Sequence, residues 1–238
     1  MTIWSDFREK RHHSWERAIV RVALVGLATA IFSAPAAWAD IIGTSGSVVI
    51  IAPPADARLG DLVDPDVLQV FPESTGVDLG SALAVNATAA GTYDNGVGPG
   101  ADLAAGITVD SFMVVCDSGG RSATCTGSIT FDTNVLGLIF STADLAASDA
   151  ILGHPGTLYS GTLANRGQEA GDSVTLSSDL RTVSFVDTVS SPGDDIRIVT
   201  APEAATVPEP SSVGFVGTCL LILVVMCSRA LHARCGRP

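Results

Sequence analysis

Lysine and histidine are scarce in this chain of 238 residues. Lys10 is the only lysine, so the chain has no phosphate-binding loop of the GK[ST] type and no catalytic lysine beyond this position. Between residues 40 and 206 the only histidine is His154, within a Gly-His-Pro-Gly sequence that predicts a loop. No Gly-x-Ser-x-Gly motif is present to supply a hydrolase nucleophile. These absences argue against a serine hydrolase.

Positive charge and aromatic side chains are also rare in residues 40–206. This stretch has 21 acidic residues and five arginines, a formal charge of −16. Nucleic acid is not expected as a partner, because phosphate binding needs clustered Lys and Arg. Tryptophan is absent, and Tyr93 and Tyr159 are the only tyrosines, which weakens the case for a stacked sugar ring. A hydrolase using paired carboxylates stays open, since sequence does not give the distance between acids.

Residues 1–39 have the pattern of a signal peptide. A basic stretch comes first, with Arg8, Lys10, Arg11 and Arg17. The apolar run that follows, 22–32, is shorter than the roughly 20 residues that cross a bilayer. Ala37 and Ala39 fit a small-residue cleavage site directly before Asp40. We therefore predict export through the inner membrane, with signal peptidase leaving Asp40 as the first residue.

Three different segments follow one another at the C-terminus. Residues 201–212 form a linker with a distinctive tripeptide, Pro208, Glu209 and Pro210. An uncharged apolar segment then begins at Val213 and ends at Cys227, which predicts a transmembrane helix over 213–228. The tail 229–238 has no acid and three basic residues, Arg229, Arg234 and Arg237. The positive-inside rule keeps this tail in the cytoplasm and places the acidic body outside.

Pro-Glu-Pro, one apolar segment and a basic tail, in this order, resemble the PEP-CTERM sorting signal of exported Gram-negative bacterial proteins. The resemblance implies recognition by an exosortase, a membrane-embedded enzyme similar to cysteine transpeptidases, which would process the chain near Pro208, Glu209 and Pro210. The chain would be anchored transiently in the membrane and then reach the cell surface or the medium. The tail is longer than is usual for this signal. Three body segments are also similar to exported proteins with this tail: 127–132, 148–153 and 193–198.

The body, residues 40–200, is predicted to be an all-β domain. Short segments rich in Val, Ile, Thr and Phe alternate with Gly, Pro, Asp and Ser, which is typical of antiparallel strands. We expect a single antiparallel β-sandwich, jelly-roll-like or Ig-like, between an N-terminal signal helix and a C-terminal transmembrane helix. The nine expected strands are 47–52, 67–71, 82–88, 107–116, 125–131, 135–140, 173–177, 182–189 and 196–200.

One helix and two turns interrupt this strand pattern. The helix is expected over 143–152, with Ser141 or Thr142 as its cap and Gly153 at its end. A turn at Ser178 and a second at 191–194 predict that the last three strands form a meander.

Cys116 and Cys125 are the only cysteines of the body. Two glycines between them let the chain reverse and bring the ends of adjacent strands together. An oxidising exterior then favours a disulfide, which would contribute about 2 to 3 kcal/mol by the chain-entropy relation. Free thiols are the alternative, and a metal site at these cysteines is disfavoured because no histidine lies nearby in the sequence.

Calcium is the ligand hypothesis that the sequence of the body supports best. The candidate ligands lie in two acidic segments: Asp61, Asp64, Asp66, Asp194 and Asp195. Hard oxygen ligands on loops suit Ca²⁺, but neither segment has the twelve-residue helix-loop-helix pattern. Solvated turn aspartates are the interpretation that we favour over a calcium site. Asn86 begins an Asn-x-Thr sequon on an expected strand, which we interpret as coincidental.

These observations predict an exported structural or adhesive protein of the cell envelope or the exopolysaccharide matrix, without catalysis or a required cofactor. Its expected partners are signal peptidase, exosortase, the membrane before processing, and extracellular polysaccharide as a candidate. The alternatives are a Ca²⁺- or polysaccharide-binding module and a secreted carboxylate-dependent hydrolase.

Overall fold

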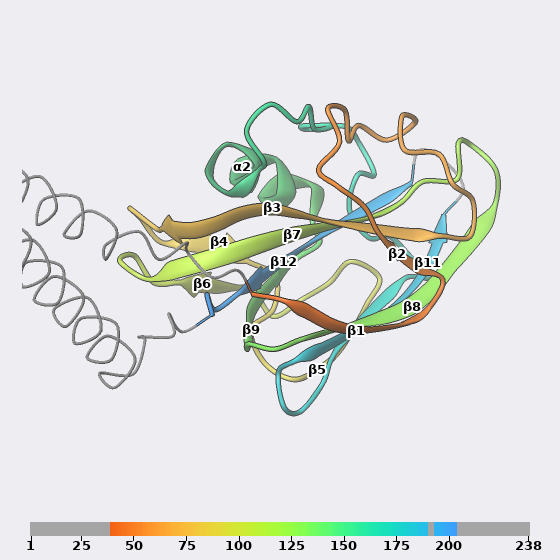
Figure 1. The fold of residues 1–238 in the computed structure, drawn as a ribbon. Helices are drawn as coiled ribbons and strands as arrows, with labels where there is room; N and C mark the ends of the chain where they lie inside the picture. The colour runs from red at the N-terminus through yellow and green to blue at the C-terminus, as the bar shows by residue number, and fades with distance from the viewer. Residues whose placement is uncertain (1–38, 190–192, 204–238) are drawn as a thin grey trace, which may run out of the picture. The chain divides into compact units, whose positions relative to one another are not determined.

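The computed structural model describes residues 39–189 and 193–203, most of which belong to β-strands (Figure 1). α2 (Thr142–Leu152) is the single helix within these ranges. None of the helical structure described is long and apolar enough to cross a membrane. The expected signal helix, the Pro-Glu-Pro tripeptide, the apolar segment and the basic tail all lie outside the described residues.

The strands form two five-stranded sheets and one two-stranded sheet. The first sheet has the order β1 (Ile41–Gly46), β8 (Ala123–Phe131), β11 (Thr182–Val189), β10 (Ser173–Leu176), β5 (Gly91–Asp94). The second has the order β2 (Val48–Ile50), β3 (Leu68–Asp78), β7 (Thr108–Cys116), β12 (Asp194–Thr200), β9 (Val135–Ile139). The small sheet pairs β4 (Leu83–Val85) with β6 (Ala101–Leu103).

The prediction of a mostly β body with antiparallel sheets and one short helix is confirmed, and each expected strand has a counterpart. Two details were wrong. β2 and β3 are parallel, which the long connection 51–67 between them permits because it returns the chain to the same end of the sheet. The last three strands form no meander: β10 and β11 are a hairpin, but β12 lies in the other sheet between β7 and β9.

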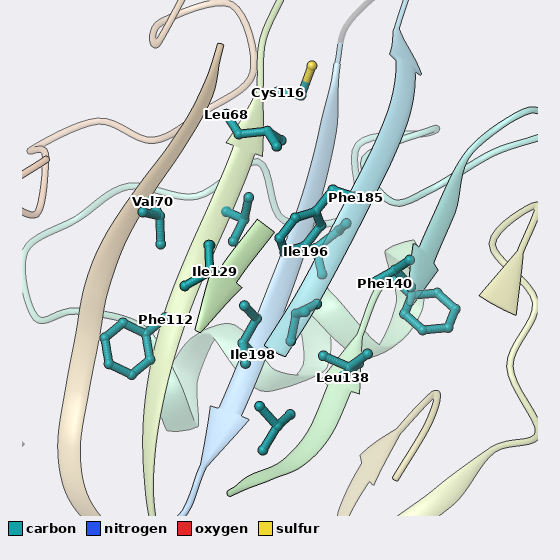
Figure 2. Close-up of a cluster of buried hydrophobic side chains, with 14 of the residues drawn as sticks. Leu68, Val70, Phe112, Cys116, Ile129, Leu138, Phe140, Phe185, Ile196 and Ile198 are labelled. Carbon is teal, nitrogen blue, oxygen red and sulfur yellow. The ribbon is translucent and has the colours of Figure 1, made fainter. Parts of the chain in front are cut away.

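One hydrophobic core contains residues of both large sheets (Figure 2). Alternation in β11 places Val183, Phe185 and Val189 on its buried face. The rings of Phe112, from the second sheet, and Phe131, from the first, have centroids 5.0 Å apart. The two sheets therefore share apolar contacts at side-chain level.

The second sheet is buried on its other face as well. Phe71, Met113 and Val199 belong to a separate core that includes Leu145 and Leu152 of α2. Figure 1 shows α2 lying over the strands β3, β7 and β12. All seven residues of β12 are buried as a result. Charged residues on this strand must therefore find partners inside the protein.

The beginning of α2 is fixed by side chains from two segments. Ser141 is the N-cap, and its hydroxyl accepts the Asp144 N–H, as expected for a serine at this position. Asn86 Oδ1 accepts the backbone N–H groups of Phe140 (2.7 Å) and Ser141 (2.9 Å), and its amide nitrogen donates to Asp144. The sequon asparagine is thus engaged in holding the helix start.

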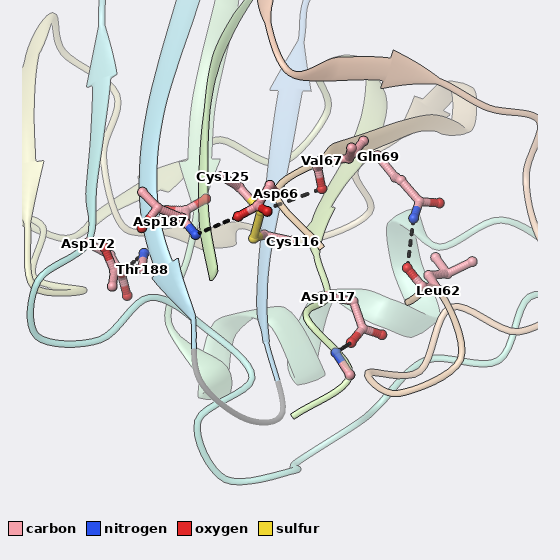
Figure 3. The surroundings of a disulfide bond; sticks show 12 residues. Leu62, Asp66, Val67, Gln69, Cys116, Asp117, Cys125, Asp172, Asp187 and Thr188 are labelled. Carbon is pink, nitrogen blue, oxygen red and sulfur yellow. Dashed lines mark hydrogen bonds between the residues drawn. A yellow bond between two sulfur atoms is a disulfide. The ribbon is translucent and has the colours of Figure 1, made fainter. Parts of the chain in front are cut away.

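The Cys116–Cys125 disulfide is present, as predicted, with 6.2 Å between the Cα atoms (Figure 3). Gly119 and Gly120 both have positive φ in the turn between the cysteines. The two strands are consecutive in the chain but lie in different sheets, contrary to the expectation of neighbouring strands. The bond therefore links one sheet to the other.

Candidate functional site

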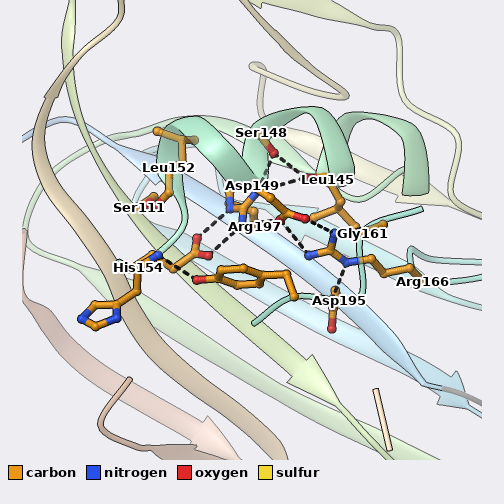
Figure 4. Close-up of polar contacts among 12 residues, drawn as sticks. Ser111, Leu145, Ser148, Asp149, Leu152, His154, Gly161, Arg166, Asp195 and Arg197 are labelled. Carbon is orange, nitrogen blue, oxygen red and sulfur yellow. Dashed lines mark hydrogen bonds and ion pairs between the residues drawn. The ribbon is translucent and has the colours of Figure 1, made fainter. Parts of the chain in front are cut away.

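Two of the body's arginines, Arg166 and Arg197, are fully buried between α2, the second sheet and the segment that follows the helix (Figure 4). Arg197 comes from the middle of β12, and Arg166 from the chain between α2 and β10. A buried guanidinium is costly unless its charge and its N–H groups are matched. The contacts around these two side chains form the most extensive polar cluster of the described residues.

Arg197 is matched mainly by Glu73 of β3. Its Nε and Nη2 donate to the two oxygens of this carboxylate, at 2.6 and 2.7 Å, in a bidentate pair. Nη2 also donates to Asp149 Oδ1 (3.0 Å), and Nη1 donates to the Leu145 carbonyl (3.2 Å) and the Ser148 hydroxyl. These contacts attach α2 to the sheet through one side chain.

Arg166 is matched by two carboxylates on different elements. Its two terminal nitrogens donate to Asp149 of α2, at 2.6 and 2.9 Å, and Nε donates to Asp195 of β12 at 2.7 Å. The Asp195 N–H also donates to the Arg166 carbonyl at 2.7 Å. Asp149 therefore joins both arginines, and the network ties the helix, the sheet and the following segment together.

Tyr159 packs against both guanidinium groups. Its ring centroid lies 5.8 Å from the Arg166 Cζ and 5.6 Å from the Arg197 Cζ, within the range of cation–π contacts. Burial, and then the charge of Glu73, raises the pKa of the Tyr159 hydroxyl. That hydroxyl accepts the backbone N–H of His154 at 2.8 Å. His154 lies in the loop after α2, as expected, with Nδ1 3.2 Å from the Thr157 hydroxyl.

The electrostatics of this network favour permanent charge on its arginines. Burial opposes that charge, but the bonds and charges of Glu73, Asp149 and Asp195 raise the pKa of both guanidinium groups. Burial raises the pKa of the Asp195 carboxyl to about 6 against the opposing effect of Arg166. The carboxylates are occupied by arginine donors, so the arrangement works as a clamp between elements.

The predicted calcium candidates are distributed over separate places. Asp61 is exposed and lies 3.8 Å from Arg58, and Asp66 accepts the Thr124 N–H. Asp195 belongs to the arginine network, while Asp194 faces the opposite core. Asp64 is also exposed, and its backbone N–H donates to the Asp117 carbonyl. Across residues 39–189 and 193–203, no three Asp, Glu, His or Cys side chains are grouped to hold a metal ion.

A second group of buried acids lies at the disulfide end of the core shared by the two sheets. Asp172, Asp187 and Asp194 are 2, 1 and 4% exposed. Burial raises the pKa of Asp187 to about 7, an effect opposed by the bond from Gln168 and supported by the charge of Asp172. Burial, then Asp172 and Asp187, raise the pKa of Asp194 to about 9.

Sequence reasoning missed both groups of buried charge. One signal was present: Asp187 follows Val183 and Phe185 at alternate positions, which places an acid on the inward face of a strand. Burial of Arg166 and Arg197 has no such signal, because it depends on α2 covering the second sheet.

Comparison with known proteins gives no relative from which to assign a function. No family model, curated protein or solved structure matches this chain.

Proposed function

We propose that this chain is an exported structural or adhesive protein of the bacterial cell surface or exopolysaccharide matrix, sorted by a PEP-CTERM signal. The observation that carries the proposal is the disulfide between the two sheets. Stable disulfides belong to oxidising compartments, and this one lies between a predicted signal peptide and a predicted sorting tail. This combination supports the proposal of export, membrane anchoring and processing near Pro208, Glu209 and Pro210.

The working part in this proposal is a β-sandwich of the jelly-roll or immunoglobulin-like kind. The core with residues from both five-stranded sheets supports a sandwich, as does the contact between Phe112 and Phe131. The disulfide would fasten the two layers at one end. Such a domain suits a protein that must persist outside the cell without chaperones.

An acidic surface supports a role in a hydrated matrix. Arg166 and Arg197 are buried and paired, so the exposed arginines of the body are Arg58, Arg121 and Arg181. The outward charge is therefore strongly negative, which favours solubility and keeps copies apart. A neutral extracellular polysaccharide would not be repelled by this surface.

The predicted leader junction places a condition on export. Ala39 is 2% exposed and its N–H donates to buried Asp110 at 2.8 Å, while the Asp40 N–H donates to Asp132 at 2.9 Å. Signal peptidase would have little access to the Ala39–Asp40 bond after folding. In the proposed pathway, cleavage therefore precedes folding of this end of the body.

Replacing Glu209 with Ala in the native host tests the sorting step. We expect the variant to accumulate in the membrane fraction with its C-terminal tail intact, because the recognition tripeptide is lost. Glu203→Ala is the matched control, since it removes a nearby acid and leaves the tripeptide unchanged. Immunoblots with antibodies against the body and the tail give the readout. Equal processing of the Glu209 variant and the control contradicts the proposed signal.

A further inference from the structure

The acids at the disulfide end of the shared core have a specific geometry. In the first sheet Asp187 pairs with Cys125, and Asp172 lies one position beyond the paired Ser173 and Val186, opposite Asp187. In the second sheet Asp194 pairs with Cys116. Directly paired residues share a face of a sheet, and the cysteines are joined across the core. Asp187 and Asp194 therefore point into the core from opposite sheets, each beside one cysteine of the disulfide.

Hydrogen bonds hold two of these acids in place. Asp172 accepts the backbone N–H groups of Glu169 (2.6 Å) and Thr188 (2.7 Å), so two main-chain donors fix its position. Asp187 Oδ1 accepts the side-chain amide of Gln168 at 2.8 Å. Figure 3 shows Asp172 and Asp187 on the same side of the disulfide. Asp172, held by two backbone donors, thus lies opposite Asp187, whose side chain belongs to a residue that is 1% exposed.

No compensating cation reaches this end within the described part of the chain. Among the described residues, none of the ion pairs involves Asp172, Asp187 or Asp194. The acids that do form ion pairs are Asp56, Asp61, Glu73, Asp149 and Asp195. Arg166, whose neighbours in the chain include Gln168, is occupied by Asp149 and Asp195. Outside the cluster, the charges that act on Asp194 are those of Glu169 and Asp195, both acids, and Asp66, which accepts the Thr124 N–H, also lies beside the disulfide (Figure 3). A buried carboxylate without a cation is stabilised by taking up a proton.

We propose that the disulfide end of the shared core is a pH-sensitive latch: it stays packed while Asp187 is protonated and loosens as Asp187 ionises against Asp172. Asp172 lies directly before β10, and Asp187 lies near the end of β11. Repulsion between the two carboxylates therefore separates the start of β10 from the end of β11. The Cys116–Cys125 bond then becomes accessible to reductants. Asp194, which holds its proton more firmly, stays neutral around neutral pH.

The direction of the pH effect follows from proton binding. With a pKa near 3.8 when unfolded and about 7 when folded, Asp187 binds more protons in the folded state between these limits. The contribution of Asp187 to stability is complete below its pKa in the unfolded chain. It is lost as the pH rises through its pKa in the folded protein. Asp187 therefore makes the folded body more stable in an acidic medium than in an alkaline one.

Asp187→Asn in the full, oxidised chain tests the latch. We expect the Tm of the variant, measured relative to wild type, to rise by roughly 5 to 10 °C between about pH 5 and about pH 8. A phosphine should also reduce the disulfide of the wild type faster than that of the variant. The ratio of these two rates should rise between about pH 5 and about pH 8. Asp179→Asn is the matched control, because Asp179 is an exposed acid with a lowered pKa. It should show neither change.

A direct titration covers the case in which the variant does not fold. Carbon NMR of the aspartate carboxyls in wild-type protein should show one group with a midpoint near pH 7 that disappears on denaturation. A Tm difference that is the same at both pH values, or ordinary midpoints for every carboxyl, would overturn the latch. So would a rise in the wild-type Tm in about 5 mM Ca²⁺ that Asp187→Asn abolishes, because the cluster would then be a cation site.

Discussion

Replacing Arg197 with Met should lower the free energy of unfolding by about 3 to 5 kcal/mol, because breaking a buried ion pair leaves an uncompensated charge. The charge left behind is Glu73, which is 1% exposed and takes both of its short bonds from this guanidinium. Arg181→Met is the matched control: its side chain is exposed, so we expect a change within about 0.5 kcal/mol. Chemical denaturation of both variants provides the measurement.

A double variant separates the ion pair from a general packing defect. Adding Glu73→Gln to Arg197→Met removes the orphaned charge, so the double variant should be more stable than the sum of the two single effects predicts. A coupling of about 2 kcal/mol or more is expected for groups in such direct contact. Simple additivity would mean that the clamp between α2, β3 and β12 is not formed in solution.

Phe131→Ala should cost about 3 to 5 kcal/mol, the usual range for truncating a fully buried ring. The cavity would open between the two sheets, next to the ring of Phe112. Ile42→Ala is the control from a neighbouring strand, since Ile42 is 62% exposed and should contribute within about 0.5 kcal/mol. Urea unfolding of each variant gives these values.

The same position tests the contact between sheets. Phe112→Ala and Phe131→Ala, when combined, should be less damaging than the sum of the single effects, because each already removes the ring contact. If the two effects add within about 0.3 kcal/mol, the rings do not touch and the shared core is incorrect.

Strands with a regular apolar pattern could be predicted from the sequence. Val174 and Leu176 alternate with Ser and Thr, and this segment is β10 as expected. The missed strands are short and polar: β1 contains Gly43 and Thr44, β5 is Gly-Thr-Tyr-Asp, and β6 is Ala-Asp-Leu. Their strand conformation depends on partners elsewhere in the chain, which local propensity does not reveal.

The candidate sites show the same division between local and long-range information. Two cysteines with a Gly-Gly turn between them were sufficient to predict the disulfide. The partners of Arg197 were not predictable, because Glu73 lies 124 residues away in the chain. Asp194 and Asp195 read as one acidic turn, yet β12 is buried on both faces, so the first enters the shared core and the second pairs with Arg166.

The mass of the intact protein isolated from its native host tests the central claim, which is export followed by removal of both ends. We expect a chain that begins at Asp40, ends within or close to the Pro208-Glu209-Pro210 segment, and gains two hydrogens on reduction of Cys116–Cys125. A chain that still extends from Met1 to Pro238 would contradict it.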